Sequence, residues 1–175
     1  MKIILIDVMS LDGKITKWDG TDAAEWASPE DGALFRQAIA ESDVLIMGGA
    51  TYRAIRPAAQ KERLRLVLTR SPDAYMQDAV AGQLEFTSEA PQEAVARLAA
   101  AGYQRALLVC GSDLATTFIK ENLVDELWVT IEPKLFGQGL PLVLPEQLDI
   151  QLRLQEFSRL NPTGAVLLKY TFLAK

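Results

Sequence analysis

The chain has 175 residues, of which 49% are hydrophobic and 23% charged, so it can fold as one domain whose core needs no disulfide or metal. Its net charge of −5, without any Lys/Arg-rich block, argues against nucleic-acid binding. It contains no histidine, which excludes Ser-His-Asp triads and histidine-ligated zinc.

The N-terminal segment combines a strand, a loop and a helix. Residues 2–9 are almost continuously apolar, which predicts a central strand buried on both faces. An acid breaks the run after four apolar residues, so we expect no signal peptide, no membrane span and a cytoplasmic protein. Residues 10–27 are polar, and Ser28 followed by Pro29 predicts a helix that runs to about residue 41. Its buried stripe is expected to comprise Ala33, Leu34, Ala38 and Ile39.

The rest of the chain alternates strand and helix signals. Strands are predicted over residues 43–47, 64–69, 84–87, 106–110, 125–131, 151–157 and 165–173. Helices are predicted from about residue 50, over 91–101, and from 112 to 120 with Ser112 or Asp113 as the cap. We therefore predict a single α/β domain over residues 1–175. Its sheet is mostly parallel and ends in an antiparallel C-terminal strand pair.

Small and polar residues gather where the predicted strands end. In a parallel α/β sheet these ends share one edge, and ligands bind there. Two junctions place glycine before a helix, so free backbone amides can bind a cofactor pyrophosphate; tight packing of helix on strand is the alternative explanation. Neither junction has the GxGxxG spacing. The candidate cofactor-binding residues of these junctions are Gly48, Gly49, Ala50, Thr51, Gly111, Ser112 and Asp113.

A third junction, formed by Thr69, Arg70 and Ser71, places an arginine between two hydroxyl groups. Such a cluster suits a phosphate, because guanidinium and hydroxyl donors bind its oxygens. In a dinucleotide site it would bind the 2′-phosphate that distinguishes NADPH from NADH. A solvated turn explains the same residues equally well.

Two charged residues near the first strand each have two explanations. Asp31 stabilises the first turn of its helix, or it lies in a pocket with Trp26 and Phe35 and binds an amino-pyrimidine by paired hydrogen bonds. Lys14 reaches a substrate phosphate or hydroxyl, or it is an ordinary solvated lysine. Cys110, the single cysteine, is expected to be a buried structural thiol in a reducing compartment.

Several ordered motifs between the first strand and about residue 143 resemble the reductase domain of bacterial riboflavin biosynthesis, which shares a fold superfamily with dihydrofolate reductase. They comprise Ser10-Leu11-Asp12-Gly13-Lys14, Trp26 with Ser28-Pro29-Glu30-Asp31, Gly49-Ala50-Thr51-Tyr52-Arg53, Leu123-Val124-Asp125-Glu126-Leu127, and Pro133 with Leu135, Gly137 and Gly139. The resemblance implies a three-layer, dihydrofolate-reductase-like fold. It also implies a homodimer that uses NADPH without metal or flavin.

The resemblance assigns roles to individual residues. Lys14 would orient the substrate, Asp31 would bind its base or relay a proton, and the three junctions would bind NADPH. The substrate-binding residues would be Asp12, Trp26, Ser28, Phe35 and Arg53. These roles require a small-molecule substrate, and we expect neither nucleic acid nor membrane as a partner.

The departures from the resemblance concern the substrate. Riboflavin-pathway reductases carry an acid where this chain has Ile55, and Glu-Gly-Gly where it has Cys110-Gly111-Ser112. Asp31 instead resembles the pteridine-binding carboxylate of dihydrofolate reductase. We expect reduction of the ribosylamino group of a pyrimidine ribose 5′-phosphate, either 5-amino-6-(5-phosphoribosylamino)uracil or its diaminopyrimidine analogue. Dihydrofolate or another pterin is the alternative substrate, and a non-catalytic nucleotide-binding domain is the third possibility.

Overall fold

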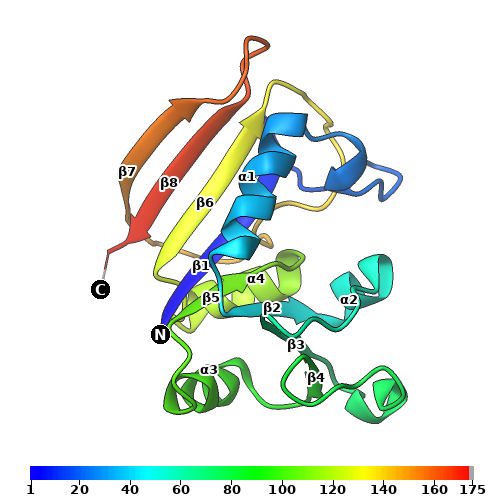
Figure 1. Cartoon of the computed structure of the whole chain (residues 1–175). Helices are drawn as coiled ribbons and strands as arrows, with labels where there is room; N and C mark the ends of the chain where they lie inside the picture. The colour runs from blue at the N-terminus through cyan, green and yellow to red at the C-terminus, as the bar shows by residue number, and fades with distance from the viewer. Residues whose placement is uncertain (174–175) are drawn as a thin grey trace.

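Eight strands form one mixed sheet in the computed structural model, which describes residues 1–173 (Figure 1). The strands are β1 (Lys2–Ser10), β2 (Val44–Gly48), β3 (Leu64–Leu68), β4 (Leu84–Thr87), β5 (Arg105–Leu108), β6 (Glu126–Glu132), β7 (Leu152–Arg159) and β8 (Val166–Phe172). Their order across the sheet is β4-β3-β2-β5-β1-β6-β8-β7. Strands β1 to β6 run parallel, whereas β8 is antiparallel to both β6 and β7. The predicted α/β fold is confirmed.

Helices cover both faces of the sheet and make the fold three layers deep. They are α1 (Pro29–Ala40), α2 (Gly49–Ile55), α3 (Pro91–Ala100) and α4 (Ser112–Lys120). One core lies between the sheet and α3 and α4, and includes Leu98 and Phe118. A second core lies on the opposite face, where Ala38 of α1 and Tyr52 of α2 pack on the sheet. The side chains of β1 alternate between these two cores, as a strand buried on both faces requires.

Helix α1 begins as the sequence predicts, but its buried stripe differs by one position. The Ser28 hydroxyl accepts a hydrogen bond from the Asp31 amide, and Pro29 occupies the first turn. Ala33 is exposed, and the face turned to the sheet instead carries Asp31, Phe35 and Ala38. The prediction for Ala33 was wrong because it assumed that only apolar residues define the buried face.

The start of helix α4 also corrects a prediction. Gly111 occupies the cap position and no side chain bonds to the free amides of the first turn. Ser112 is buried and its hydroxyl donates to the Pro141 carbonyl, so it does not cap the helix, and neither does Asp113. Two short 3-10 helices, η1 (Ala23–Glu25) and η2 (Pro72–Tyr75), lie in segments where only loop and turn were predicted. No helix within residues 1–173 is long and apolar enough to cross a membrane.

Candidate active-site cleft

The strand order creates a point where neighbouring connections diverge. Strands β2 and β5 are adjacent, yet from β2 the chain passes through α2 to β3, and from β5 it passes through α4 to β6 on the other side. The two helices lie on opposite faces of the sheet. Divergence of this kind opens a crevice at the carboxyl ends of the strands, which is where open α/β sheets bind ligands. The predicted junctions after β1, β2, β3 and β5 all end at this edge.

The first turns of α2 and α4 have amides that no side chain caps. Each helix starts at a glycine in extended conformation, Gly48 for α2 and Gly111 for α4, and neither start has a side-chain hydrogen bond. Unpaired amides and the helix dipole together favour an anion. Ala50 is exposed and Thr51 is half-buried beside these amides. The amides of both first turns are therefore free of side-chain caps, and pyrophosphate binding by them stays a prediction.

The structure brings the predicted junction at Gly49 and the one at Thr69 together. A Cβ atom on Gly49 would lie 3.1 Å from the Thr69 Oγ1 and 3.2 Å from the Thr69 Cβ, so glycine is what lets α2 approach the end of β3. The Thr69 hydroxyl also accepts a hydrogen bond from the Ser71 amide at 3.4 Å. Arg70 and Ser71 are exposed next to this contact. Close packing of helix on strand is therefore one reason for glycine at this junction, and phosphate binding there stays a prediction.

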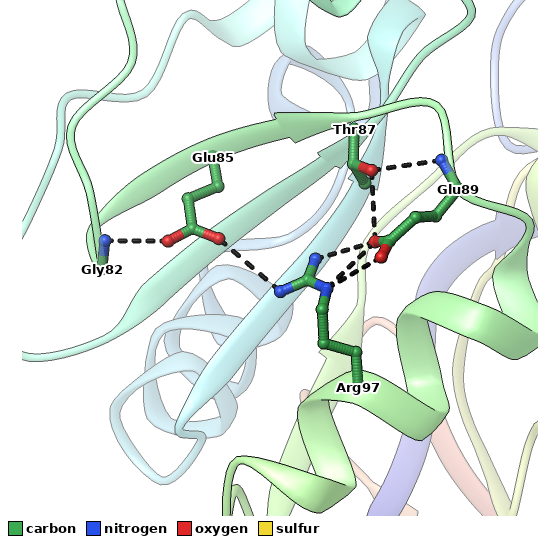
Figure 2. A network of polar contacts seen from close by, with 5 residues as sticks. All are labelled: Gly82, Glu85, Thr87, Glu89 and Arg97. Atoms are coloured by element: carbon green, nitrogen blue, oxygen red, sulfur yellow. Dashed lines mark hydrogen bonds and ion pairs between the residues drawn. The ribbon is translucent and has the colours of Figure 1, made fainter.

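A polar network behind this turn holds it in place. The Thr69 amide donates to the Thr87 carbonyl at 2.9 Å. Figure 2 shows Thr87 of β4 and Arg97 of α3 converging on the Glu89 carboxylate. The Arg97 Nη2 lies 2.9 Å from the Glu89 Oε2, and Glu85 forms a second ion pair with Arg97. The hydrogen bond from Arg97 is the main cause that lowers the pKa of Glu89. These contacts hold the end of β4 against α3. Because the Thr87 carbonyl at that end accepts the Thr69 amide hydrogen bond, they also help to hold Thr69 in place.

The side chains at the start of α4 are engaged elsewhere. The Ser112 hydroxyl bonds to Pro141, as described above. Asp113 is exposed and lines a surface hollow with Thr117, Lys120 and Glu146 on the outer side of the helix. At this predicted junction, the backbone amides of the first turn of α4 have no side-chain cap, so they are the groups left for a ligand.

Asp31 lies in a buried polar cluster, which we call the Asp31 pocket, between the start of α1 and the end of β6. Its side chain is 9% exposed and faces the end of β6, where Thr130 and Glu132 are also buried. Burial is the main cause that raises the pKa of Asp31; the nearby Thr130 hydroxyl opposes the rise, and the charge of Glu132 adds to it. Glu132 accepts a hydrogen bond from the Ser28 amide at 2.7 Å. Asp31 is therefore a first-turn acid that is also buried among polar residues, and its binding of a base stays a prediction.

Aromatic residues line the approach to this pocket. Trp26 is buried and packs edge-on against Phe136, with ring centroids 5.0 Å apart, and Lys134 lies over its indole ring. Its indole N–H is buried and has no partner within residues 1–173. An unpaired buried donor is costly, so a bound molecule that accepts from it would be favoured. Phe35 of α1 is half-buried against the sheet core on the same face.

Asp12 and Lys14 belong to the turn after β1, and both contact loops that are distant in the sequence. Asp12 accepts hydrogen bonds from the Ser10 hydroxyl and from the amides of Phe136 and Gly137, and the bond from Ser10 is the main cause that lowers its pKa to about 2. Both carboxylate oxygens thus join two loops of the chain. Lys14 is half-buried, and its backbone bridges to Pro141.

Three other residues singled out by sequence lie outside the Asp31 pocket. Arg53 is exposed, donates to the Tyr75 hydroxyl at 3.1 Å and approaches Gly49, which places it beside the start of α2. Ile55 is 52% exposed at the end of α2. Cys110 is a free, buried thiol, and burial raises its pKa well above the usual range. The expectation of a buried thiol is confirmed.

Sequence reasoning missed three polar residues near the cleft. Thr130 and Glu132 face Asp31, and their signal was the polar residue inside or at the end of an otherwise buried strand. Asp7 in β1 is the third, and the same signal applies to it. The sequence pattern around Asp7 predicts only that this residue interrupts an apolar run.

Comparisons with known proteins agree with this geometry. The RibD C-terminal domain family matches residues 1–166. The uncharacterized protein YwjB of Bacillus subtilis (strain 168) is 29% identical over 168 residues, which cover 88% of this chain and 89% of that protein. Among solved structures, a pyrimidine reductase-like protein from Corynebacterium diphtheriae has a TM-score of 0.81 at 17% identity, over 99% of this chain and 92% of that one.

A second structure shows the same fold within a longer protein. The Thermotoga maritima diaminohydroxyphosphoribosylaminopyrimidine deaminase/5-amino-6-(5-phosphoribosylamino)uracil reductase has a TM-score of 0.78 at 14% identity. The similarity covers 98% of this chain and 56% of that one. With a family match over almost its whole length, the chain belongs to the RibD C-terminal domain family.

Proposed function

We propose that the protein is an NADPH-dependent reductase of the riboflavin-pathway type. The observation that carries this proposal is the pair of uncapped helix starts, Gly48 and Gly111, on either side of the divergence between β2 and β5. Family membership supports an oxidoreductase with a nicotinamide cofactor. The buried acid of the Asp31 pocket at the same edge supports a small polar substrate beside that cofactor.

The residues present fit a dinucleotide phosphate. The amides at the starts of α2 and α4 would hold the pyrophosphate, and Gly49 leaves the space that a Cβ atom would fill. Arg70 is exposed beside the hydroxyls of Thr69 and Ser71 and would bind the adenosine 2′-phosphate, which selects NADPH. Bound NADPH supplies a hydride, and the chain orients the acceptor and excludes water.

For the substrate we propose a pyrimidine that carries a ribosylamino phosphate. Asp31 would bind polar atoms of the base, because it is held in a buried pocket with Thr130 and Glu132. The free indole N–H of Trp26 offers a further donor. Lys14, on the turn after β1, would neutralise the ribose phosphate.

A pterin is the second candidate substrate, and one observation favours it. Asp31 is a buried carboxyl whose raised pKa allows it to share or accept a proton, and such a group pairs well with the amino-pyrimidine edge of a pterin. The position that riboflavin-pathway reductases fill with an acid is Ile55 here, and it is exposed.

Cofactor binding and turnover test the proposal together. Wild type should bind NADPH more tightly than NADH and oxidise it with one of the two substrates. Arg70→Ala should weaken NADPH much more than NADH, by roughly 10- to 100-fold for a lost charge-assisted contact. Lys61→Ala, on the exposed loop at the opposite end of β3, removes the same charge and should leave both affinities unchanged.

The outcomes separate the alternatives. Binding without turnover of either substrate would favour the non-catalytic nucleotide-binding domain. No binding of NADPH at physiological concentration would remove both enzyme readings. Full pterin reduction by Asp31→Asn would remove the pterin mechanism, and equal weakening of NADPH and NADH by Arg70→Ala would contradict the placement of the 2′-phosphate.

We also propose a homodimer that associates through β7 and β8. In Figure 1 these strands form the edge of the sheet beyond the helices. Three apolar residues of β7 are exposed, and Phe157 is 65% exposed. They pair across the strands with apolar residues of β8: Leu152 with Phe172, Leu154 with Tyr170 and Phe157 with Leu168. An apolar face of this kind on a sheet edge is covered in a stable protein, and a second copy of the chain would cover it.

Light scattering tests the dimer directly. Wild type should elute with twice the mass of the chain, and Phe157→Glu should give monomers that keep their circular dichroism. A monomeric wild type would contradict the proposal. For the compartment we propose the cytoplasm, because the free thiol of Cys110 suits a reducing environment.

A further inference from the structure

Asp7 occupies the place where the sheet opens between β1 and β5. The parallel pairing of these strands ends at Leu5 and Leu108, whereas β1 continues to Ser10 along β6. The pairing of this segment with β2 continues one residue further, because the Val109 amide donates to the Ile46 carbonyl at 2.9 Å. Asp7 is the second residue of β1 after the last pair with β5. It therefore borders the opening beside the end of β5, the strand that leads into the start of α4.

The Asp7 side chain has one engaged oxygen and one free oxygen. Its Oδ1 accepts a hydrogen bond from the Val8 amide at 2.8 Å, which holds the carboxyl against the backbone of β1. No hydrogen bond within residues 1–173 reaches Oδ2, and the side chain is half-buried rather than enclosed. A carboxyl that is fixed by one oxygen and accessible at the other can present a proton to a ligand in the opening.

The groups around Asp7 come from both faces of the sheet. Asp31 lies on α1, Asp22 lies on the loop before η1, and Cys110 follows β5 in the core below α3 and α4. Burial is the main cause that raises the pKa of Asp7 to about 8; the Val8 hydrogen bond opposes the rise, and the charges of Asp31 and Asp22 add to it. The carboxyl is thus protonated at neutral pH.

We infer that Asp7 is the proton donor of the reduction. This inference rests on the proposed function. Both candidate substrates present a C=N bond: the ring-opened ribosylamine is an imine, and a dihydropterin has one in its ring. A hydride adds to the carbon, the π electron pair moves to the nitrogen, and the O–H bond at Asp7 Oδ2 breaks as the new N–H bond forms. The Asp7 carboxylate then regains a proton from water.

Asp7→Asn is the sharpest variant, because the amide oxygen can still accept from the Val8 amide while the acidic proton is lost. Asp125→Asn is the matched control. Asp125 also accepts a hydrogen bond from a β1 amide, that of Ile3 at 2.7 Å, but at the opposite end of the strand. At pH 7 we expect kcat of Asp7→Asn to fall by about 100-fold or more, with KM little changed, and Asp125→Asn to retain kcat. The wild-type kcat should decline above about pH 8, and the decline should be absent in Asp7→Asn.

A second readout needs no turnover. With ¹³C-labelled aspartate carboxyls, the signal lost in Asp7→Asn should titrate near pH 8 in the free protein. NADP⁺ carries a positive charge on its nicotinamide ring, so its binding should lower that midpoint if the ring lies beside Asp7. A signal already ionised at pH 6, or one that NADP⁺ does not move, would overturn the assignment.

The results distinguish the two proposals. If wild type turns over and Asp7→Asn matches its kcat and pH profile, the role of Asp7 fails while the reductase stands. If wild type binds NADPH but reduces neither substrate, the carboxyl titration with NADP⁺ decides the role of Asp7. If wild type does not bind NADPH, the proposed function fails and Asp7 loses its role with it.

Discussion

Replacing Asp7 by asparagine should change how stability depends on pH, whatever the protein reduces. The folded state holds the Asp7 proton up to about pH 8, whereas an unfolded chain releases it near the ordinary value of 3.8. Below pH 4 both states are protonated and the stabilising contribution is complete. As pH rises to about 8, the unfolded state is increasingly favoured, because only it gains the solvated charge. The Asp7→Asn variant cannot ionise at this position, so it lacks this pH-dependent loss of stability.

The magnitude follows from the size of the shift. Each pH unit between the two values is worth about 1.4 kcal/mol, so the full interval sets an upper limit of about 6 kcal/mol. Relative to wild type, Asp7→Asn should therefore gain stability steadily from pH 4 to pH 8 and gain no more above it.

Urea unfolding followed by tryptophan fluorescence measures this difference. The free energy of unfolding of both proteins is determined at each pH unit from 5 to 9, with coincident circular dichroism transitions as the check on two-state behaviour. Taking the difference between variant and wild type cancels the titration of all other groups that the substitution leaves alone. A difference that stays constant across this range would refute the reasoning, because it would mean that Asp7 titrates alike in both states.

Three further predictions concern the loops and the cofactor junction. Gly137 and Gly139 both have positive φ, but only at Gly139 would a Cβ atom meet backbone, 2.1 Å from the Thr16 carbonyl oxygen. Gly137→Ala should therefore lower the free energy of unfolding by about 1–2 kcal/mol in urea, and Gly139→Ala should lower it clearly more. Equal losses would contradict the contact at Gly139. Asp12→Asn should lower the Tm at pH 7, and this loss should shrink as the pH falls toward 2. The reason is that the ionised Asp12 carboxylate, whose pKa is lowered to about 2, stabilises the fold only at a pH above its pKa. A loss of Tm that does not depend on pH would contradict this account. Gly49→Ala should weaken NADPH several-fold in a fluorescence titration, because the added Cβ pushes on Thr69, and unchanged affinity would show that the junction tolerates the shift.

The sequence was sufficient for the elements and for most of their ends. Ser28 and Pro29 mark the start of α1, and the apolar run of β1 marks a strand with two covered faces. Local chemistry determines such features, so a single segment reveals them. Ala33 was placed wrongly because a polar residue, Asp31, takes part of the buried face.

The site was only partly predictable, because its contacts join distant segments. The proximity of Gly49 and Thr69 depends on the pairing of β2 with β3, and that of Asp31 and Glu132 depends on where α1 crosses the sheet. The hydrogen bonds of Asp12 to the amides of Phe136 and Gly137 span more than a hundred residues. Asp7 has no partner on β5 only because the pairing of β5 with β1 ends before β1 does, and strand lengths of that kind cannot be read from β1 alone.

Transfer of label from NADPH is the most direct test of the central claim, that hydride passes from a nicotinamide to a substrate in this cleft. Wild type is incubated with NADPH that carries deuterium at the transferred position of C4 and with each candidate substrate, and the product is analysed by mass spectrometry. The account predicts one deuterium on the reduced carbon of the product and oxidation of an equal amount of NADPH. An unlabelled product, or no oxidation of NADPH with either the ribosylaminopyrimidine phosphate or dihydrofolate, would contradict it.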